Sequence, residues 1–277
     1  MAGSASLPIR RARDQSCVID HRLKRYDAFM SKLLIIKTGS APEPVASAHG
    51  DFDQWFLDGL GLDASLAIVI DVHAGQRLPD HRGDLAGVLV TGSPAMVSHR
   101  EDWSERTAGW LAEAHQAALP MLGVCYGHQL IAHALGGRVG PNPHGRRMGT
   151  KSVEIRADTA DLMAGLGRLL ELHVTHVEAV LQPPSGARIT AETDGDPHHG
   201  LHFGHRSWGV QFHPEFTIEI MASYIRLRSE ALRNEGQCPD TLVAELKDTS
   251  DGFRILRRFT DRLESTTAQR PRSTATI

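Results

Sequence analysis

The sequence predicts an α/β fold: a mostly parallel sheet with helices on both faces and an antiparallel excursion around residues 150–212. Short apolar runs alternate with amphipathic stretches, which is typical of βαβ units. The run at residues 119–124 is apolar throughout, as expected of a strand that is covered on both faces. From residue 150 to residue 212 the strand-like runs become short and alternate apolar with polar residues, which indicates antiparallel strands.

The expected elements follow in order along the chain. Apolar runs of strand length predict strands at residues 33–37, 66–72, 85–91 and 119–124. Helical spacing of apolar residues predicts helices at residues 51–60, 103–118 and 126–135, the last of them ended by Gly136 and Gly137 in a left-handed cap. A hairpin is expected from residues 200–203 and 207–212, and amphipathic helices from residues 217–234 and 251–263.

The composition indicates a water-soluble globular chain and excludes two classes of partner. Of the 277 residues, 41% are hydrophobic and 23% are charged, and the net charge is −3. No positive field is therefore expected to hold nucleic acid or an anionic membrane. No apolar run approaches the ~20 residues that span a bilayer. The three cysteines are far apart and odd in number, which fits neither a disulfide framework nor a zinc motif and favours a reducing, cytoplasmic location.

One domain is expected between two tails. Residues 1–31 mix basic and acidic side chains and lack the apolar stretch of an export signal, so they are predicted to form a poorly ordered leader, with Met30 as a candidate translation start. Residues 32–265 are predicted to form the domain, including the C-terminal helices. Residues 266–277 are polar and aperiodic, which predicts a frayed tail.

The most informative segment is LPMLGVCYGHQLIAHALGG, residues 119–137. Its apolar strand ends at Cys125 and a helix begins within one or two residues, while Gly123 and Gly127 permit a sharp turn. This is the pattern of a nucleophile elbow built around a thiol. A helix N-terminus favours the thiolate, which is the reactive form. On this segment alone, a small buried hydrophobic residue explains Cys125 equally well.

A second motif supplies the groups that a thiol nucleophile needs. In SWGVQFHPEF, residues 207–216, His213 and Glu215 stand two apart, so both side chains lie on one face of an extended chain. A histidine can take up the thiol proton and later deliver a proton to a leaving amine, and a carboxylate on its other nitrogen fixes the tautomer. Taken alone, the motif also fits an exposed turn with an incidental histidine.

Together, GVCYGHQLIAHALGG and GVQFHPEF resemble the class I, triad-type glutamine amidotransferases, and they are most similar to the glutaminase domain of GMP synthase. The resemblance covers residues 33–216 and implies the flavodoxin-like α/β fold of that family. It also implies a catalytic triad, in which Cys125 is the nucleophile, His213 the general base and acid, and Glu215 the residue that orients the histidine.

The resemblance further implies an oxyanion hole. The segment TGSPAMV, residues 91–97, stands where the family usually has Gly-Gly-Pro. The backbone amides of Ser93 and Tyr126 are then expected to hold the oxyanion. Ser93 replaces the second glycine of this turn, a departure that matters only if the peptide needs a positive φ.

Three further residues are expected to bind substrate by the same resemblance: Gly92, Gln129 and His176. Gln129 belongs to the CxGxQ pattern of the elbow helix, although a solvated helix residue would fit the same position. His176 stands where the family often has Ser-His-Gly-Asp, but here Val177 and Glu178 replace the glycine and the aspartate. Altered substrate choice is one consequence to expect.

The implied chemistry is hydrolysis of the glutamine side-chain amide through a γ-glutamyl thioester, with neither metal nor cofactor. In the family the ammonia passes to a synthetase or transferase, so a separate acceptor enzyme is the implied partner. The chain has no GxxxxGK[ST] motif and is not expected to activate an acceptor with nucleotide. Two alternatives stay open: a stand-alone γ-glutamyl peptidase or hydrolase that acts on larger γ-glutamyl compounds, and a catalytically idle regulatory or binding protein.

A crowded group of histidines suggests a metal site, but the spacing argues against it. His198, His199, His202 and His205 fall in one strand-like stretch, so alternation divides them between two faces. No set of cysteines or carboxylates in that stretch completes a tetrahedral site. We therefore expect no metal.

A basic run, PNPHGRRMGTK, stands at residues 141–151. It places Arg146, Arg147 and Lys151 beside the expected cysteine cleft. Proline, asparagine and glycine at its start are typical of turns. An exposed loop is therefore the prediction for this run.

Overall fold

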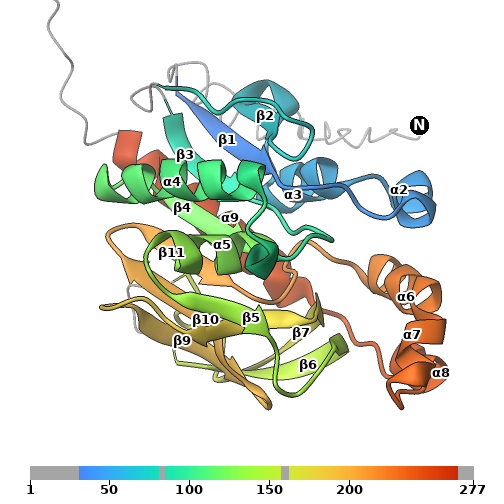
Figure 1. Cartoon of the computed structure of the whole chain (residues 1–277). Helices are drawn as coiled ribbons and strands as arrows, with labels where there is room; N and C mark the ends of the chain where they lie inside the picture. The colour runs from blue at the N-terminus through green and yellow to red at the C-terminus, as the bar shows by residue number, and fades with distance from the viewer. Residues whose placement is uncertain (1–30, 81–84, 157–161, 268–277) are drawn as a thin grey trace, which may run out of the picture. The chain divides into compact units, whose positions relative to one another are not determined.

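The computed structural model describes residues 31–80, 85–156 and 162–267, which belong to one compact unit (Figure 1). The expected leader, except for Ser31, lies outside the described residues. The last helix runs to Thr267, two residues into the expected tail, and the remainder of that tail is also outside the described part.

A nine-stranded sheet runs through this unit in the order β2-β1-β3-β4-β11-β10-β9-β6-β7. Its first five strands are mutually parallel: β2 (Ala67–Asp71), β1 (Lys32–Lys37), β3 (Leu85–Val90), β4 (Met121–Val124) and β11 (Ser207–Val210). The other four are antiparallel: β10 (Asp196–Gly204), β9 (Arg188–Thr193), β6 (Arg147–Ile155) and β7 (Leu169–His176). The predicted fold class is confirmed, and the antiparallel excursion extends the same sheet.

A smaller two-stranded sheet pairs β5 (Arg138–Pro141) with β8 (Glu178–Gln182) in antiparallel fashion. The predicted hairpin is also present: β10 and β11 pair through Gly200 with Val210 and through His202 with Trp208. The turn between them uses His205, which has a φ of 48°. A positive φ is uncommon for residues with a side chain, but histidine is among those that accept it in tight turns.

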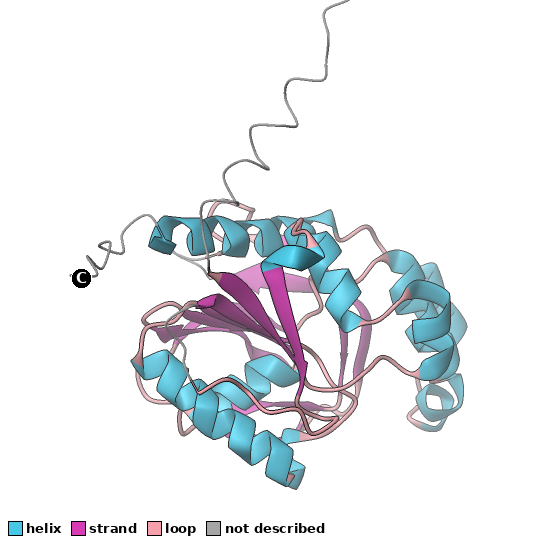
Figure 2. Cartoon of the chain, turned by 90° about the horizontal axis from the view of Figure 1, so that it is seen from above, coloured by secondary structure: helices cyan, strands magenta, loops and turns pink. Residues whose placement is uncertain are grey.

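Helices cover both faces of the sheet (Figure 2). The cause is visible in β1, where Leu33 and Ile35 enter one core while Leu34 and Ile36 enter the other. The first core includes residues of α3 (Phe52–Leu60) and α9 (Ser250–Thr267), and the second includes residues of α4 (Asp102–Gln116) and α5 (Tyr126–Ala134). A parallel strand is apolar wherever both of its faces are buried, as β4 is throughout and β1 is between its terminal lysines.

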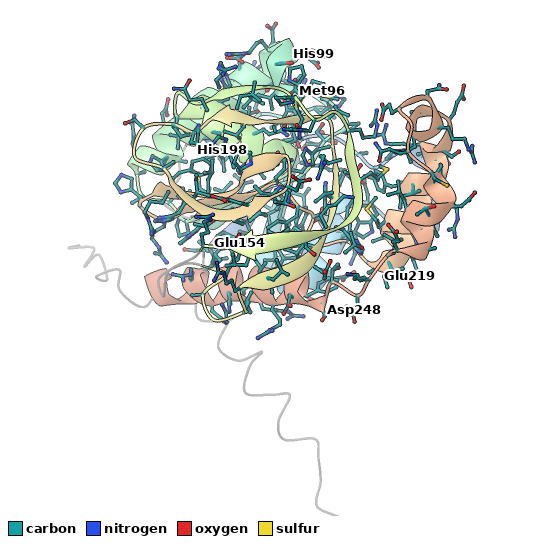
Figure 3. The ribbon with its side chains drawn as sticks, turned by 90° about the horizontal axis from the view of Figure 1, so that it is seen from below. Met96, His99, Glu154, His198, Glu219 and Asp248 are labelled. Carbon is teal, nitrogen blue, oxygen red and sulfur yellow. The ribbon has the colours of Figure 1, made fainter. Side chains whose placement is uncertain are left out.

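Further short elements complete the described chain. They are α2 (Glu43–His49), η2 (Ala64–Leu66), η3 (Val97–His99), α6 (Ile218–Leu227), α7 (Ser229–Asn234) and α8 (Pro239–Ala244). The helices α6, α7 and α8 lie at one side of the sheet, where α6 and α8 contact β6 (Figure 1). Figure 3 marks α6 by its residue Glu219. No described helix has the combination of length and apolar character that crossing a bilayer demands.

The structure corrects three sequence predictions. The helix expected at residues 217–234 is broken at Arg228, which ends α6 and precedes α7 with a φ of −98° and a ψ of 15°. The helices α2 and α8 were not predicted, because each buries only one side chain, Val45 or Pro239, and so has no apolar period.

The third correction concerns the basic run at residues 141–151. The turn ends at Arg146, and Arg147 begins β6, whose residues pair with β7 from Arg147 opposite His176 onward. Met148 is fully buried, and Lys151 is half-buried. The prediction failed because the start of the run is rich in turn-forming residues. The strand that follows is stabilised by hydrogen bonds to its partner β7, which the local sequence does not show.

Candidate active site

Cys125 occupies a strained turn between β4 and α5. Its φ of 52° and ψ of −102° lie outside the regions that side-chain-bearing residues prefer. The turn is held from both sides: the N–H of Cys125 donates to the Val210 carbonyl oxygen at 2.8 Å, and that of Gly127 donates to the Thr91 carbonyl oxygen at 3.1 Å. A nucleophile elbow has this geometry.

The glycines of the elbow are required by close packing between backbones. A Cβ atom at Gly127 would lie 2.3 Å from the Val90 carbonyl oxygen, and one at Gly123 would lie 2.4 Å from the carbonyl oxygen of Gly127. Neither backbone group can move aside as a flexible side chain could. Strand and helix can therefore approach closely enough to form the turn only with glycine at both positions.

His213 and Glu215 follow the end of β11 and are both buried. The Nδ1–H of His213 donates to Glu215 Oε1 at 2.7 Å, which fixes the tautomer and leaves Nε2 as the reactive nitrogen. Backbone contacts position the ring as well, because the N–H of His213 donates to the His173 carbonyl oxygen at 2.8 Å. The imidazole stacks on Phe216, with ring centroids 4.2 Å apart.

Gly92 brings the thiol and the imidazole together. A Cβ atom at this position would lie 2.9 Å from His213 Cε1 and 3.7 Å from Cys125 Cβ. The two side chains therefore flank Gly92 on neighbouring sides. The Cys125 thiol also lies 3.9 Å from the Thr175 carbonyl oxygen. Among the described residues, the buried Nε2 atom of His213 has no hydrogen-bond partner.

Electrostatics favour the protonated form of His213. Burial opposes the charged ring, but the negative charge of Glu215 and that of Cys125 outweigh burial and raise the pKa of His213. A cysteine thiolate beside an imidazolium is the activated pair of a thiol-dependent hydrolase. The arrangement can attack a carbonyl carbon with sulfur and protonate a departing nitrogen.

Ser93 and Tyr126, the residues expected to supply the oxyanion N–H groups, both line the larger cavity with Cys125. Within the described residues, neither N–H donates to an acceptor. Ser93 is not among the described residues with a positive φ, so the replacement of glycine there introduces no such strain. Its hydroxyl instead donates to the Thr38 carbonyl oxygen at 2.6 Å and accepts from the Ala95 N–H at 3.1 Å, which anchors the loop.

A cavity of about 120 Å³ opens beside Cys125. Gln129 and His176, two of the residues expected to bind substrate, line it, whereas Gly92 lies between the thiol and the imidazole and is not part of the lining. The Gln129 Nε2 donates to the Glu178 carbonyl oxygen at 2.8 Å and to Gln211 Oε1 at 2.9 Å. Gln129 therefore also ties α5 to the residues that follow β7.

A second, smaller cavity of about 30 Å³ lies on the His213 side of Cys125. Its lining includes Phe52, Tyr224 and Arg228. A volume of about 10–15 Å³ suffices for one water molecule, so this space accepts only small groups. The linings of the two cavities have five residues in common: Ser93, Pro94, Cys125, Thr175 and Arg228.

Sequence reasoning missed Thr175 and Arg228 as lining residues, whereas it placed Arg146 beside the cysteine cleft but expected it in an exposed loop. Arg146 is half-buried and its Nε donates to Glu235 at 2.9 Å. Arg228 stood in an apparently regular amphipathic helix. No local pattern pointed to it, because its position depends on how α6 packs.

Three buried groups from the strands β7 and β10 could hold a metal ion. The ligand atoms of His176, Asp196 and His199 lie within 4.8 Å of one another. The Nδ1–H of His199 donates to Asp196 Oδ2 at 2.9 Å, so a proton already joins two of the three groups. Three groups are also one short of a closed tetrahedral site. Sequence reasoning considered only the histidine run and missed that His199 faces His176 of β7.

The family model described as "Glutamine amidotransferase class-I" matches residues 64–228, which include the elbow and the His213–Glu215 pair. The chain belongs to this family. The resemblance inferred from the two motifs is thereby confirmed.

Among characterised relatives, the GMP synthase [glutamine-hydrolyzing] of Aeropyrum pernix is 39% identical over 158 residues, which are 55% of this chain and 29% of that protein. The GMP synthase of Thermomicrobium roseum is 34% identical over 139 residues, covering 50% of this chain and 25% of that protein. The amidotransferase chain thus spans less than a third of the length of these relatives.

Solved structures share the fold. A glutamine amidotransferase from Methylobacillus flagellatus has a TM-score of 0.69 at 18% identity, covering 90% of this chain and 99% of that one. One from Thermotoga maritima has a TM-score of 0.66 at 17% identity, covering 87% and 99%. At these identities the likeness concerns the fold alone.

Proposed function

We propose that this class-I glutamine amidotransferase hydrolyses the side-chain amide of glutamine through a Cys125–His213–Glu215 triad and passes the ammonia to a separate acceptor enzyme. The observation that carries the proposal is the elbow cysteine at a φ of 52°, flanked across Gly92 by an imidazole whose Nδ1–H is held by Glu215. The matching GMP synthases are named glutamine-hydrolysing, which supports glutamine as substrate.

The first half of the reaction releases ammonia. The Cys125 thiolate attacks the γ-carbonyl carbon, and the N–H groups of Ser93 and Tyr126 stabilise the negative oxygen of the tetrahedral intermediate. The His213 imidazolium then gives its Nε2 proton to the amide nitrogen as the C–N bond breaks. Ammonia leaves and a γ-glutamyl thioester remains on the sulfur.

The second half releases glutamate. Neutral His213 takes a proton from water, and the resulting hydroxide attacks the thioester carbonyl carbon. The same two amides hold the second oxyanion, and its collapse expels the Cys125 thiolate with the imidazolium restored beside it. Glu215 supports the imidazolium in both halves without itself gaining a proton.

The cavity on the His213 side favours glutamine over larger γ-glutamyl compounds. The leaving group must lie on the side of the group that protonates it, and that cavity measures about 30 Å³. Ammonia is about the size of a water molecule and fits this volume. The free thiols of Cys125 and Cys238 support operation in the reducing environment of the cytoplasm.

A γ-glutamyl peptidase is the second candidate, and one observation favours it: the larger cavity reaches both His176 and Arg146. The assay that decides measures glutamate release from glutamine and from γ-glutamyl peptides, with and without candidate acceptor enzymes. If the enzyme releases glutamate faster from a γ-glutamyl peptide than from glutamine, its activity is that of a peptidase and not of a glutaminase. No turnover of any substrate would leave the idle binding protein.

A further inference from the structure

Arg228 is a cation that lines the cavities beside the nucleophile. It lies at the junction of α6 and α7, lines both cavities together with Cys125, and is only partly exposed. Among the described residues its side chain makes no ion pair and no hydrogen bond, and its Nε is buried with no acceptor. Burying a guanidinium costs free energy unless an acceptor replaces the lost water.

Arg146 adds a second positive charge to the same place. It lines the larger cavity, and it is close enough for its charge, in addition to burial, to lower the pKa of Arg228. The nearby carboxylate of Glu235 accepts from Arg146 Nε at 3.2 and 2.9 Å and leaves Arg228 without a hydrogen-bonded anion. The charge of Glu235 also acts on Arg228, but among the described residues this carboxylate forms its ion pair with Arg146 alone.

The opposite charge is also present in the larger cavity. Glu178 lines it and is 4% exposed, with its Oε2 accepting from the Ser98 N–H at 3.3 Å. A wall that carries a carboxylate and guanidinium groups complements an amino acid, which has an ammonium and a carboxylate on one carbon. Guanidinium is the side chain best suited to a carboxylate, because its planar donors can form two parallel hydrogen bonds.

We propose that Arg228, assisted by Arg146, binds the α-carboxylate of the γ-glutamyl substrate and restricts the site to γ-glutamyl compounds whose α-carboxylate is free. The inference rests on the proposed function, because that function places the γ-carbonyl at Cys125. Arg228 lines both cavities and Arg146 only the larger one, and the proposed function assigns the leaving group to the smaller one. The arginine pair therefore converges on the glutamyl part of the substrate.

The test is a comparison of ligands with and without the carboxylate. In a Cys125→Ala background, calorimetry measures binding of L-glutamine and of its α-amide, which differ only in that group. We expect glutamine to bind more tightly. Arg228→Gln should weaken glutamine binding about tenfold to hundredfold while the affinity for the α-amide is unchanged, since a hydrogen-bonded charge contributes about that much. Arg228→Lys should retain part of the preference.

The matched control is Arg226→Gln, an exposed arginine of the same helix, which should change neither affinity. In the active enzyme, Arg228→Gln should raise KM for glutamine with little change in kcat, the signature of lost ground-state binding. Equal weakening of both ligands, or no weakening of either, would overturn the proposal. The proposal would also be overturned if Arg228 recognised a carboxylate on the leaving group. In that case Arg228 would make γ-glutamylglycine bind more tightly than γ-glutamylmethylamide.

Binding without turnover separates this proposal from the proposed function. Arg228-dependent preference for glutamine in the Cys125→Ala protein, with no hydrolysis by the unmodified protein, would refute the proposed function and leave the carboxylate subsite standing. Hydrolysis of glutamine that does not depend on Arg228 would do the reverse. Thermal unfolding of each variant checks that the protein is still folded, so that weaker binding reflects the lost side-chain group and not misfolding.

Discussion

The parallel and antiparallel halves of the sheet contribute to the site in different ways. In the parallel half, backbone turns carry the groups proposed to react: Cys125 stands at a φ of 52° after β4, and the Ser93 amide follows the end of β3. In the antiparallel half, the strand β7 supplies side chains and carbonyl groups, such as His176 in the cavity wall and the His173 carbonyl oxygen that accepts from the His213 N–H at 2.8 Å.

This difference separates the placing of reacting atoms from the shaping of a pocket. A nucleophile and its oxyanion donors must be placed within a fraction of an ångström, and a short turn between packed elements does so with few degrees of freedom. A pocket wall tolerates more variation, so it can be assembled from strands that meet only in the folded chain. The open end of parallel strands is the usual place for the former.

The largest expected effect is at the elbow of the parallel half. Cys125→Ala should lower glutamate release by at least about 10⁴-fold, because loss of a nucleophile abolishes the covalent route. A coupled glutamate assay measures it. Cys238→Ala is the matched control, since Cys238 is the other described free cysteine and is exposed. Full activity of the Cys125 variant would show that the reacting atoms lie elsewhere.

The next effect is at the residue that holds His213. Glu215→Gln should lower kcat by roughly 10² to 10⁴-fold, as loss of an orienting carboxylate does in related triads. The charge of Glu215 raises the pKa of His213, so the pKa should fall when Glu215 loses that charge. The limb of the pH–rate profile that depends on the His213 imidazolium should then shift to lower pH. Glu219→Gln, at an exposed position of α6, should leave rate and profile unchanged. An unshifted profile would deny Glu215 its orienting role.

A third prediction concerns the buried histidines around the antiparallel half. Burial is the largest cause that lowers the pKa of His128 to about 3, and that of His173 and His176 to about 4, from 6.5. Below pH 6.5 these histidines bind protons in the unfolded chain but stay neutral in the folded chain. The free energy of unfolding is therefore highest above pH 6.5. It falls as the pH drops toward 4, by on the order of 3 kcal/mol for each histidine.

Urea unfolding at several pH values measures this loss. His128→Gln should flatten the dependence on pH, whereas His205→Asn, at an exposed turn, should leave its slope unaltered. His205 has a φ of 48°, which asparagine also accepts. A stability that does not change between pH 7 and pH 4 would contradict the assignment of neutral histidines to this half.

The smallest expected effect tests the contact between the two groups of the site. Gly92→Ala adds a Cβ atom 2.9 Å from His213 Cε1 and should displace the ring by a few tenths of an ångström, lowering kcat about tenfold. Gly109→Ala is the control, because nothing lies within 4 Å of a Cβ atom there and alanine favours its helix. Unchanged kcat in the Gly92 variant would mean that His213 tolerates displacement.

Much of the parallel half could be predicted from local sequence alone. Apolar runs located β1, β3 and β4, and the glycines around Cys125 indicated the sharp turn, because these signals depend on residues a few positions apart. The pairing of His213 with Glu215 likewise followed from their separation by two residues. Resemblance to the glutamine amidotransferases joined the two motifs, which are about ninety residues apart in the chain.

The sequence by itself therefore determined the fold class and the elbow, and it predicted the Cys–His–Glu set that we propose as the triad. Only the tertiary structure decided the pocket. Arg228 reaches Cys125 because a helix breaks at that residue, Arg146 joins it because the strand β6 begins at the next residue, and His176 meets Asp196 and His199 across β7 and β10. Such contacts depend on strand register and on the burial of whole faces, which no local spacing encodes.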